Sequence, residues 1–113
     1  MITISLPLPP SVNQLYANVG RRRVKTKAAR NWHKEASWLI KLEAKGRRID
    51  GPWAISVTLP RSMKGDPDNR LKAVLDAAVA SGCVIDDRHC VAVNVVRTGA
   101  TSAALVTLRA ADG

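Results

Sequence analysis

Two stretches of the chain alternate strictly between apolar and polar side chains, and this period of two constrains the fold more than any other feature. Residues 2–6 read Ile-Thr-Ile-Ser-Leu, and residues 53–59 read Trp-Ala-Ile-Ser-Val-Thr-Leu. Such alternation is typical of strands with one buried and one exposed face. Two further strands are expected at residues 91–97 and 103–109. A turn at residues 98–100 joins them, so a hairpin is predicted.

A helical period of about 3.6 residues separates these strands. From Thr26 to Ala44 the apolar residues share one side, Thr26 suits the N-cap and Gly46 stands just beyond the end. The expected buried side comprises Ala29, Trp32, Ala36, Leu39 and Ile40. A second helix is expected within residues 66–82, with Gly82 as its C-terminal cap. Its expected buried stripe comprises Leu71, Val74, Leu75, Ala78 and Val79.

The resulting order, β-α-β-α-β-β, predicts the α+β class, with two helices packed on a mixed or antiparallel four-stranded sheet. A length of 113 residues suits a single small domain spanning residues 1–113. The proline-rich residues 7–13 indicate a rigid extended connector, and residues 20–23 indicate a basic loop.

The charge balance points to a polyanionic partner. Eighteen Lys and Arg oppose nine Asp and Glu, which gives a formal charge of +9. Such an excess favours nucleic acid, although a high isoelectric point can also serve solubility alone. No apolar run approaches the ~18 to 20 residues of a membrane span, and the first residues do not resemble a signal peptide. A cytoplasmic protein, without a membrane partner, is therefore expected.

One face of the first helix carries a row of positive charge. Within about 60° of its helical wheel lie Lys27, Arg30, Lys34, Lys41 and Lys45. A solvated helix face is the structural alternative, but like charges at i, i+4 weaken an isolated helix by ~0.2 to 0.5 kcal/mol per pair. The candidate DNA-binding residues are therefore Arg21, Arg22, Arg23, Lys27, Arg30, Lys34 and Lys41. Trp38 lies on this same side, where it either packs, fills an interface or stacks on a base.

The acidic residues are concentrated in two short segments. Asp66 and Asp68 precede the second helix, and Asp86 and Asp87 precede the next strand. Capping, with an i, i+4 ladder of Asp68, Lys72 and Asp76, would explain part of the pattern. It does not explain two acidic pairs, which the chain would bring together if it returned beside the helix start.

Such a cluster of carboxylates is unfavourable without a cation. Two like charges ~4 Å apart cost about 4 kcal/mol at an effective dielectric of 20. Mg²⁺ prefers oxygen ligands and leaves room for a substrate phosphate. We therefore expect three or four of the carboxylates of Asp66, Asp68, Asp86 and Asp87 to hold Mg²⁺, for which Mn²⁺ can substitute. Lys72 would stabilise charge on the phosphate or the leaving oxygen during phosphodiester hydrolysis.

At these residues the sequence resembles the RusA family of Holliday junction resolvases. The pattern Asp-x-Asp-Asn-x-x-Lys occurs here as Asp66, Asp68, Asn69 and Lys72, and Asp86-Asp87 follows before a Val-rich strand. The opening residues 6–13, Leu-Pro-Leu-Pro-Pro-Ser-Val-Asn, also resemble the family's N-terminal signature. In place of the family's arginine run, only Arg61 and Lys64 precede Asp66, and Arg70 stands where Leu is usual.

The resemblance implies a homodimer that binds four-way DNA junctions and makes paired, Mg²⁺-dependent nicks during recombination and repair. It also implies that Asp66, Asp68 and Asp87 are the essential carboxylates and Lys72 the catalytic lysine. Two other functions remain open from the residues themselves. One is a prophage DNA-binding module without catalysis, and the other is a nuclease that prefers flaps or forks. Cys83 and Cys90 are too few for a disulfide scaffold and are expected to be free thiols in a reducing compartment. Their spacing from His89 does not suit a zinc site.

Overall fold

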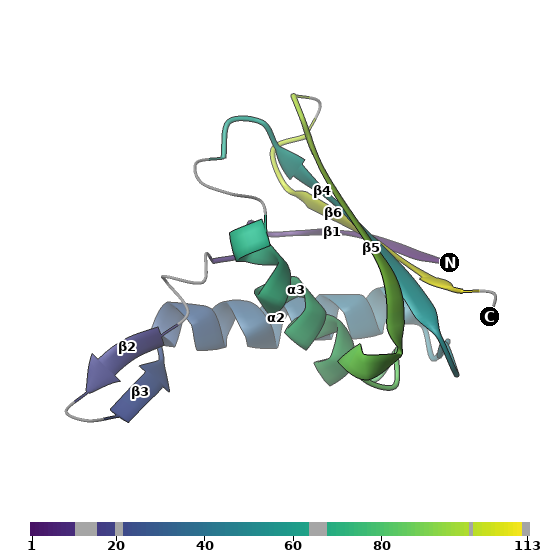
Figure 1. Ribbon diagram of the computed structural model, residues 1–113, viewed down its shortest axis with the longest axis horizontal. Coiled ribbons are helices and arrows are strands. Elements are labelled where there is room, and N and C mark those ends of the chain that lie inside the picture. Colours follow the sequence, from purple (N-terminus) through teal and green to yellow (C-terminus); the bar gives the residue numbers. More distant parts are fainter. Residues whose placement is uncertain (11–15, 20–21, 64–67, 100, 112–113) are drawn as a thin grey trace.

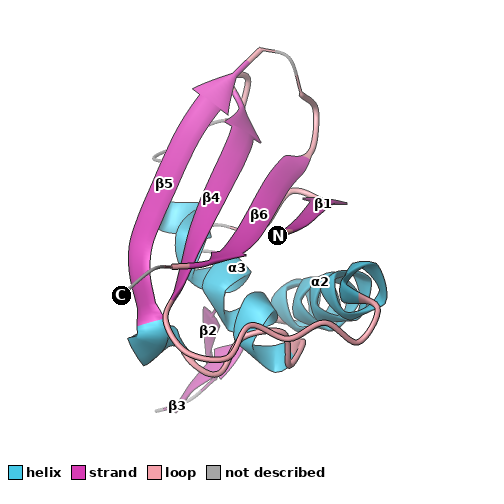
Figure 2. Cartoon of the chain, turned by 90° about the vertical axis from the view of Figure 1, so that its right-hand side faces the viewer, coloured by secondary structure: helices cyan, strands magenta, loops and turns pink. Residues whose placement is uncertain are grey.

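Two helices lie against one face of a four-stranded sheet in the computed structural model of the chain, which confirms the α+β class (Figures 1 and 2). The structure describes residues 1–10, 16–19, 22–63, 68–99 and 101–111, with the backbone alone for 16–19, 22–25 and 68–69. The sheet contains β1 (Ile2–Leu6), β4 (Trp53–Pro60), β5 (Cys90–Thr98) and β6 (Ala104–Ala110), and the helices are α2 (Lys27–Ala44) and α3 (Asp68–Ala80). A hairpin of β2 (Tyr16–Val19) and β3 (Arg22–Lys25) precedes α2, and the short 3-10 helix η1 (Asp87–His89) precedes β5.

The sheet is mixed, with the strand order β1-β6-β4-β5. Strands β4 and β5 run parallel, whereas β6 is antiparallel to both β1 and β4. The predicted hairpin of the last two strands is therefore wrong, because β6 crosses past β4 and inserts between β4 and β1. Burial accounts for this arrangement. Ala104, Val106 and Leu108 on β6 are fully buried and suit a central strand, while Val91 and Val96 on β5 remain exposed at the sheet edge.

The basic segment before α2 is a hairpin rather than a loop. Strands β2 and β3 pair antiparallel, with Val19 opposite Arg22 and Asn18 opposite Arg23. The prediction of a loop was thus wrong for Arg22 and Arg23, while Gly20 and Arg21 lie outside the described residues. Charged residues in β3 hide the usual alternation, so pairing with β2 decides its conformation. In Figure 1 the hairpin projects beyond the start of α2.

Helix α2 confirms the predicted boundaries and the predicted buried side. The Thr26 hydroxyl accepts the backbone N–H of Ala29 at 3.1 Å, so Thr26 is the N-cap. After Ala44 the chain turns through Lys45, whose φ of 52° is left-handed, and Gly46. The buried positions of the helix are Ala29, Trp32, Ala36, Ile40 and Ala44, whereas Leu39, which was also predicted to be buried, is only partly buried. The basic face consequently points to solvent.

Helix α3 buries a different stripe from the one expected. Val74 and Ala78 are buried as predicted, but Leu71, Leu75 and Val79 are only partly buried. Ala73 and Ala77 are buried in their place. The helix is rotated because alanine lets its backbone approach the sheet and α2 closely, and the larger side chains then fill its flank.

Polar contacts place the starts of both helices at one end of the sheet and their ends at the other. At the first end, Trp32 donates its indole N–H to the carbonyl of Pro7 at 3.0 Å, and Arg70 donates to the carbonyl of Pro9. At the second end, the thiol of Cys83 lies 4.0 Å from the carbonyl of Ile40. The first end is here called the Arg70 end and the second the Ser81 end.

Candidate functional site

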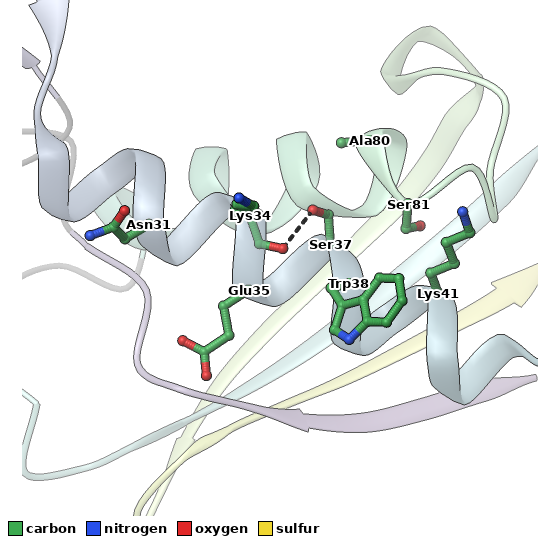
Figure 3. Close-up of a pocket in the computed structure, with 8 residues that line it drawn as sticks. All are labelled: Asn31, Lys34, Glu35, Ser37, Trp38, Lys41, Ala80 and Ser81. Carbon is green, nitrogen blue, oxygen red and sulfur yellow. Dashed lines mark hydrogen bonds between the residues drawn. The ribbon is translucent and has the colours of Figure 1, made fainter.

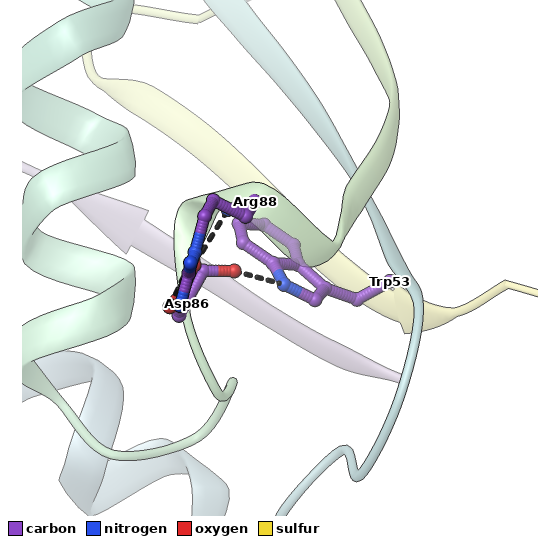
Figure 4. A network of polar contacts seen from close by, with 3 residues as sticks. All are labelled: Trp53, Asp86 and Arg88. Atoms are coloured by element: carbon purple, nitrogen blue, oxygen red, sulfur yellow. Dashed lines mark hydrogen bonds and ion pairs between the residues drawn. The ribbon is translucent and has the colours of Figure 1, made fainter.

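The second acidic pair stands where the chain enters β5. Asp86 caps η1, and Asp87 is the first residue of that short helix. Trp53, fully buried at the start of β4, donates its indole N–H to the backbone carbonyl of Asp86 at 3.0 Å (Figure 4). A core tryptophan therefore holds the acidic turn in place at the Ser81 end.

The carboxylate of Asp86 is already paired with Arg88. Arg88 Nη2 lies 3.0 Å from Oδ2, and the Arg88 backbone N–H donates to Oδ1 at 2.7 Å. Hydrogen bonds from the Arg88 side chain, and then from its backbone, lower the pKa of Asp86 below its ordinary value. Asp87 is exposed, and its carboxylate forms no ion pair with the described part of the chain. Of the two carboxylates, that of Asp87 is therefore the freer to bind a cation.

The first acidic segment lies at the other end of α3. Asp66 is outside the described residues, and only the backbone of Asp68 is described, as the first residue of the helix. Arg70 ties this start to the segment after β1, whereas Asp86 is tied to the start of β4. The 13 residues of α3 span about 20 Å. Within one chain, the helix therefore separates the backbone of Asp68 from Asp86 and Asp87.

Lys72 projects from the first turns of α3, one turn after Asp68. Its ammonium nitrogen lies 3.8 Å from Oδ2 of Asp76, and the two side chains are 52% and 35% exposed. The Lys72–Asp76 half of the predicted ladder is therefore present, as a loose and solvated contact. Such a contact leaves the ammonium able to approach a phosphate.

The basic candidates divide between α2 and the hairpin. Lys27, Arg30, Lys34 and Lys41 are all exposed on the outer face of α2. Arg22 and Arg23 lie in β3, beside the start of α2, and Arg21 lies outside the described residues. The exposed cations of α2 thus form one basic face, and the backbone of Arg22 and Arg23 precedes this face in the chain.

Arg97 is a further charged residue that sequence reasoning missed. On β5 it stands opposite Leu59, on the side of the sheet that faces the helices. Its Nε and Nη2 atoms are buried without a hydrogen-bond partner among the residues that the structure describes. A buried cation is stable only beside an anion. The signal was available, because an arginine occupies a core-facing position of an otherwise Val-rich strand.

Both cysteines are free thiols, as expected. Cys83 is buried and Cys90 is half-buried at the start of β5. Burial raises the pKa of the Cys90 thiol, and the nearby charge of Asp87 adds to this effect. Throughout the described ranges, no three His, Cys, Asp or Glu side chains gather closely enough to hold a metal ion. The side chains of Asp66 and Asp68 lie outside those ranges, so the predicted metal set stays a prediction.

Comparison with known proteins agrees with the motifs. The family model for endodeoxyribonuclease RusA matches residues 7–109, which include both acidic segments and Lys72. The chain belongs to the RusA endodeoxyribonuclease family. It is also 31% identical over 94 residues to the crossover junction endodeoxyribonuclease RusA of Aquifex aeolicus, an alignment that covers 81% of this chain and 74% of that protein.

Membership of the RusA family makes this chain an endonuclease and confirms the predicted family. The match begins at Pro7, within the N-terminal signature, and ends at Arg109 in β6. It therefore includes the hairpin, both helices and all the sheet strands after β1. None of the described helices is long and apolar enough to cross a membrane.

Proposed function

We propose that this RusA family member resolves four-way DNA junctions by paired, Mg²⁺-dependent cleavage, in recombination and repair. The observation that carries the proposal is the family match across both acidic segments, supported by the name of the Aquifex relative. The formal charge of +9 suits a DNA substrate. Because that substrate is cellular DNA, we place the protein in the cytoplasm of a bacterium, encoded by the cell or by a phage.

The carboxylates of Asp66, Asp68 and Asp87 would hold the ion, with Mn²⁺ as a possible substitute for Mg²⁺. When bound, the ion would supply an acidified water and neutralise charge on the phosphate. Arg88 fixes Asp86 beside Asp87 and withdraws its carboxylate from easy coordination. Lys72 would donate to the phosphate or leaving oxygen, since its only described ion pair is loose.

A homodimer could bring the acidic segment of one chain beside the other acidic segment of its partner. Mg²⁺ binds oxygen ligands at about 2.0 to 2.1 Å, so one ion cannot be reached from both ends of a single α3. Two nicks in a symmetric junction also require two active sites. We therefore propose that Asp87 of one chain approaches Asp66 and Asp68 of a second copy.

Strand β5 is the surface that favours such a dimer. It lies at the sheet edge, and Val91, Val93 and Val96 are 61%, 46% and 44% exposed. A two-fold axis would pair β5 with itself in an antiparallel manner. Since β4 and β5 are parallel, the start of one β5 would then lie near the strand ends of the second copy. From those ends, the chain leads to Asp66 and Asp68.

DNA would be held by the basic residues of the hairpin and of α2. The residues proposed for this role are Arg21, Arg22, Arg23, Lys27, Arg30, Lys34 and Lys41. Those on α2 are exposed and share one side of the helix. Their phosphate contacts would be independent of sequence, and base preference at the cut would come from other residues.

The decisive test is cleavage of a labelled four-way junction, read on a denaturing gel with Mg²⁺, with Mn²⁺ and with chelator. We expect paired nicks that need the metal and that disappear in the Asp68→Asn variant, while a gel-shift assay still detects junction binding. Intact strands under all conditions would identify a DNA-binding module without catalysis. If a flap or a fork were cut faster than the junction in the same assay, that structure would be the preferred substrate.

A further inference from the structure

A groove between α2 and the end of α3 contains the most exposed tryptophan of the chain. The groove encloses about 600 Å³ and is walled by Trp38 and Lys41 on α2 and by Ala80 and Ser81 at the Ser81 end (Figure 3). Trp38 is 57% exposed, whereas Trp32 and Trp53 are 8% and 0% exposed. The sequence left open whether Trp38 packs, and this exposure shows that it does not pack in the described fold.

The groove continues past Trp38 along the same helix. A second depression of about 530 Å³ shares Trp38 and Lys41 with the first, and it extends to Leu42, Lys45 and the turn at Gly82. Leu42 is 52% exposed. The two depressions meet at Trp38, Lys41 and Ser81, and together they are here called the Trp38 channel.

The charges beside the Trp38 channel are mainly positive. Lys34 stands four residues before Trp38 and Lys41 three residues after it, so all three share one face of α2. Lys45 adds a third ammonium along the channel, and Glu35 is the one carboxylate among its described lining residues. An aromatic surface flanked by cations suits a ligand whose flat aromatic rings are joined by negatively charged groups. Unpaired nucleotides have this chemistry.

We propose that the Trp38 channel binds a single-stranded segment of DNA, with a base stacked on the indole and flanking phosphates on Lys34 and Lys41. This inference rests on the proposed function only for the source of the single strand, which would be the unpaired nucleotides at a DNA branch. Duplex DNA does not suit the channel. Its bases are already stacked on one another and cannot stack on the indole, and its phosphates have no favourable interaction with an apolar surface.

A second copy of the chain fits the Trp38 channel less well than DNA. A two-fold interface there would place Lys34 and Lys41 against the same residues of the other copy. Like charges in contact cost energy that an exposed indole would have to offset. The channel also ends at the turn 81–83, three residues before Asp86. A strand in the channel would therefore lead toward the acidic turn at the Ser81 end.

The test uses tryptophan fluorescence and an oligothymidine. Because Trp38 alone of the three tryptophans is well exposed, stacking should quench its share of the emission of the full-length protein. Trp38→Leu keeps the apolar bulk without the aromatic face and should weaken oligothymidine binding roughly 5- to 100-fold, since one stacked base accounts for about that factor. Trp38→Phe keeps a ring and should recover most of the affinity.

Three controls separate this proposal from its rivals. Affinity for a blunt duplex should change less than about twofold in Trp38→Leu, and thermal unfolding should match the wild type. Equal loss for duplex and single strand would overturn the stacking role. Dissociation of a dimer by Trp38→Leu, measured by sedimentation, would overturn it in favour of an interface between copies. Oligothymidine binding needs neither a junction nor cleavage, so the channel can be confirmed even if junction resolution fails.

Discussion

Helices α2 and α3 pack on the same face of the sheet and begin at the same end, yet they differ in chemistry. Helix α2 presents Lys27, Lys34 and Lys41 to solvent along one side. Helix α3 has its first acidic segment at its start and leads, through a tight turn, to Asp86 and Asp87. Under the proposed function, this difference assigns the binding of DNA and its cleavage to separate elements of one scaffold. Each activity should therefore be removable without the other.

The largest effect is expected from the acidic turn. Asp87→Asn keeps the shape of the side chain but removes the charge of the carboxylate proposed to bind the metal. We expect junction cleavage to fall by more than about 100-fold, because changes outside the coordination sphere already cost about 10- to 100-fold. Junction affinity should remain or increase, since a negative charge near DNA is lost. Single-turnover cleavage gels and gel shifts without metal measure the two quantities.

Asp50→Asn is the matched control for Asp87→Asn. Asp50 is an exposed carboxylate that pairs with Arg48 at 3.2 Å, and the substitution changes the net charge by the same amount. The Asp50→Asn variant should cleave the junction at the wild-type rate. Near-normal cleavage by Asp87→Asn would remove the acidic turn from the chemistry and leave only its structural role.

Lys72 should show the next largest effect. Lys72→Ala removes the ammonium proposed to contact the phosphate, and cleavage should fall about 10²- to 10³-fold, as for the loss of one transition-state donor. The free energy of unfolding should change by less than about 0.5 kcal/mol, because an exposed i, i+4 pair contributes no more. Denaturant titration and single-turnover cleavage check the two statements.

Asp76→Asn distinguishes the chemistry of Lys72 from its ion pair. This variant also breaks the 3.8 Å contact but leaves the ammonium in place. We expect nearly normal cleavage from it. If Asp76→Asn lost as much activity as Lys72→Ala, then Lys72 would act by orienting Asp76 instead of by contacting the substrate.

The basic face of α2 predicts a smaller effect, which is a purely electrostatic change in the affinity for DNA. Replacing Lys34 and Lys41 together by Ala should make the slope of log K against log salt less negative by about 0.9 per lysine on duplex DNA. Cleavage at saturating protein should persist. Arg109→Ala is the control, since Arg109 is exposed on β6 opposite Ala54 and away from the helices. An unchanged slope in the double variant would show that α2 is not the binding face.

The sequence predicted α2 well because its signals are local. A capping threonine, a Trp and an Ile at helical spacing, and a glycine after the end all concern contacts within a few residues. The predicted stripe of α3 was partly wrong because hydrophobicity favours Leu71 and Leu75, while closeness to the sheet favours Ala73 and Ala77. That choice depends on tertiary packing, which no local pattern records.

The pairing of β5 and the layout of the acidic residues were beyond local signals for the same reason. A short turn between two strands favours a hairpin, but β4 and α3 together impose a parallel neighbour on β5. The sequence shows two acidic segments, whose joint role stays a prediction. The separation of Asp68 from Asp86 and Asp87 follows from the straight length of α3, which the spacing of residues 68 to 87 does not reveal by itself.

The smallest effect is expected at the start of the basic helix. Thr26→Ala removes the hydroxyl that accepts the Ala29 N–H at 3.1 Å, and the free energy of unfolding should fall by about 1 kcal/mol. Thr26→Ser retains the acceptor and should lose much less. The cap lies at the Arg70 end, but the substitution changes no charge and none of the proposed catalytic side chains, so the cleavage rate of bound DNA should not change well below the melting temperature. A loss of cleavage under those conditions would contradict the division of roles between α2 and the ends of α3.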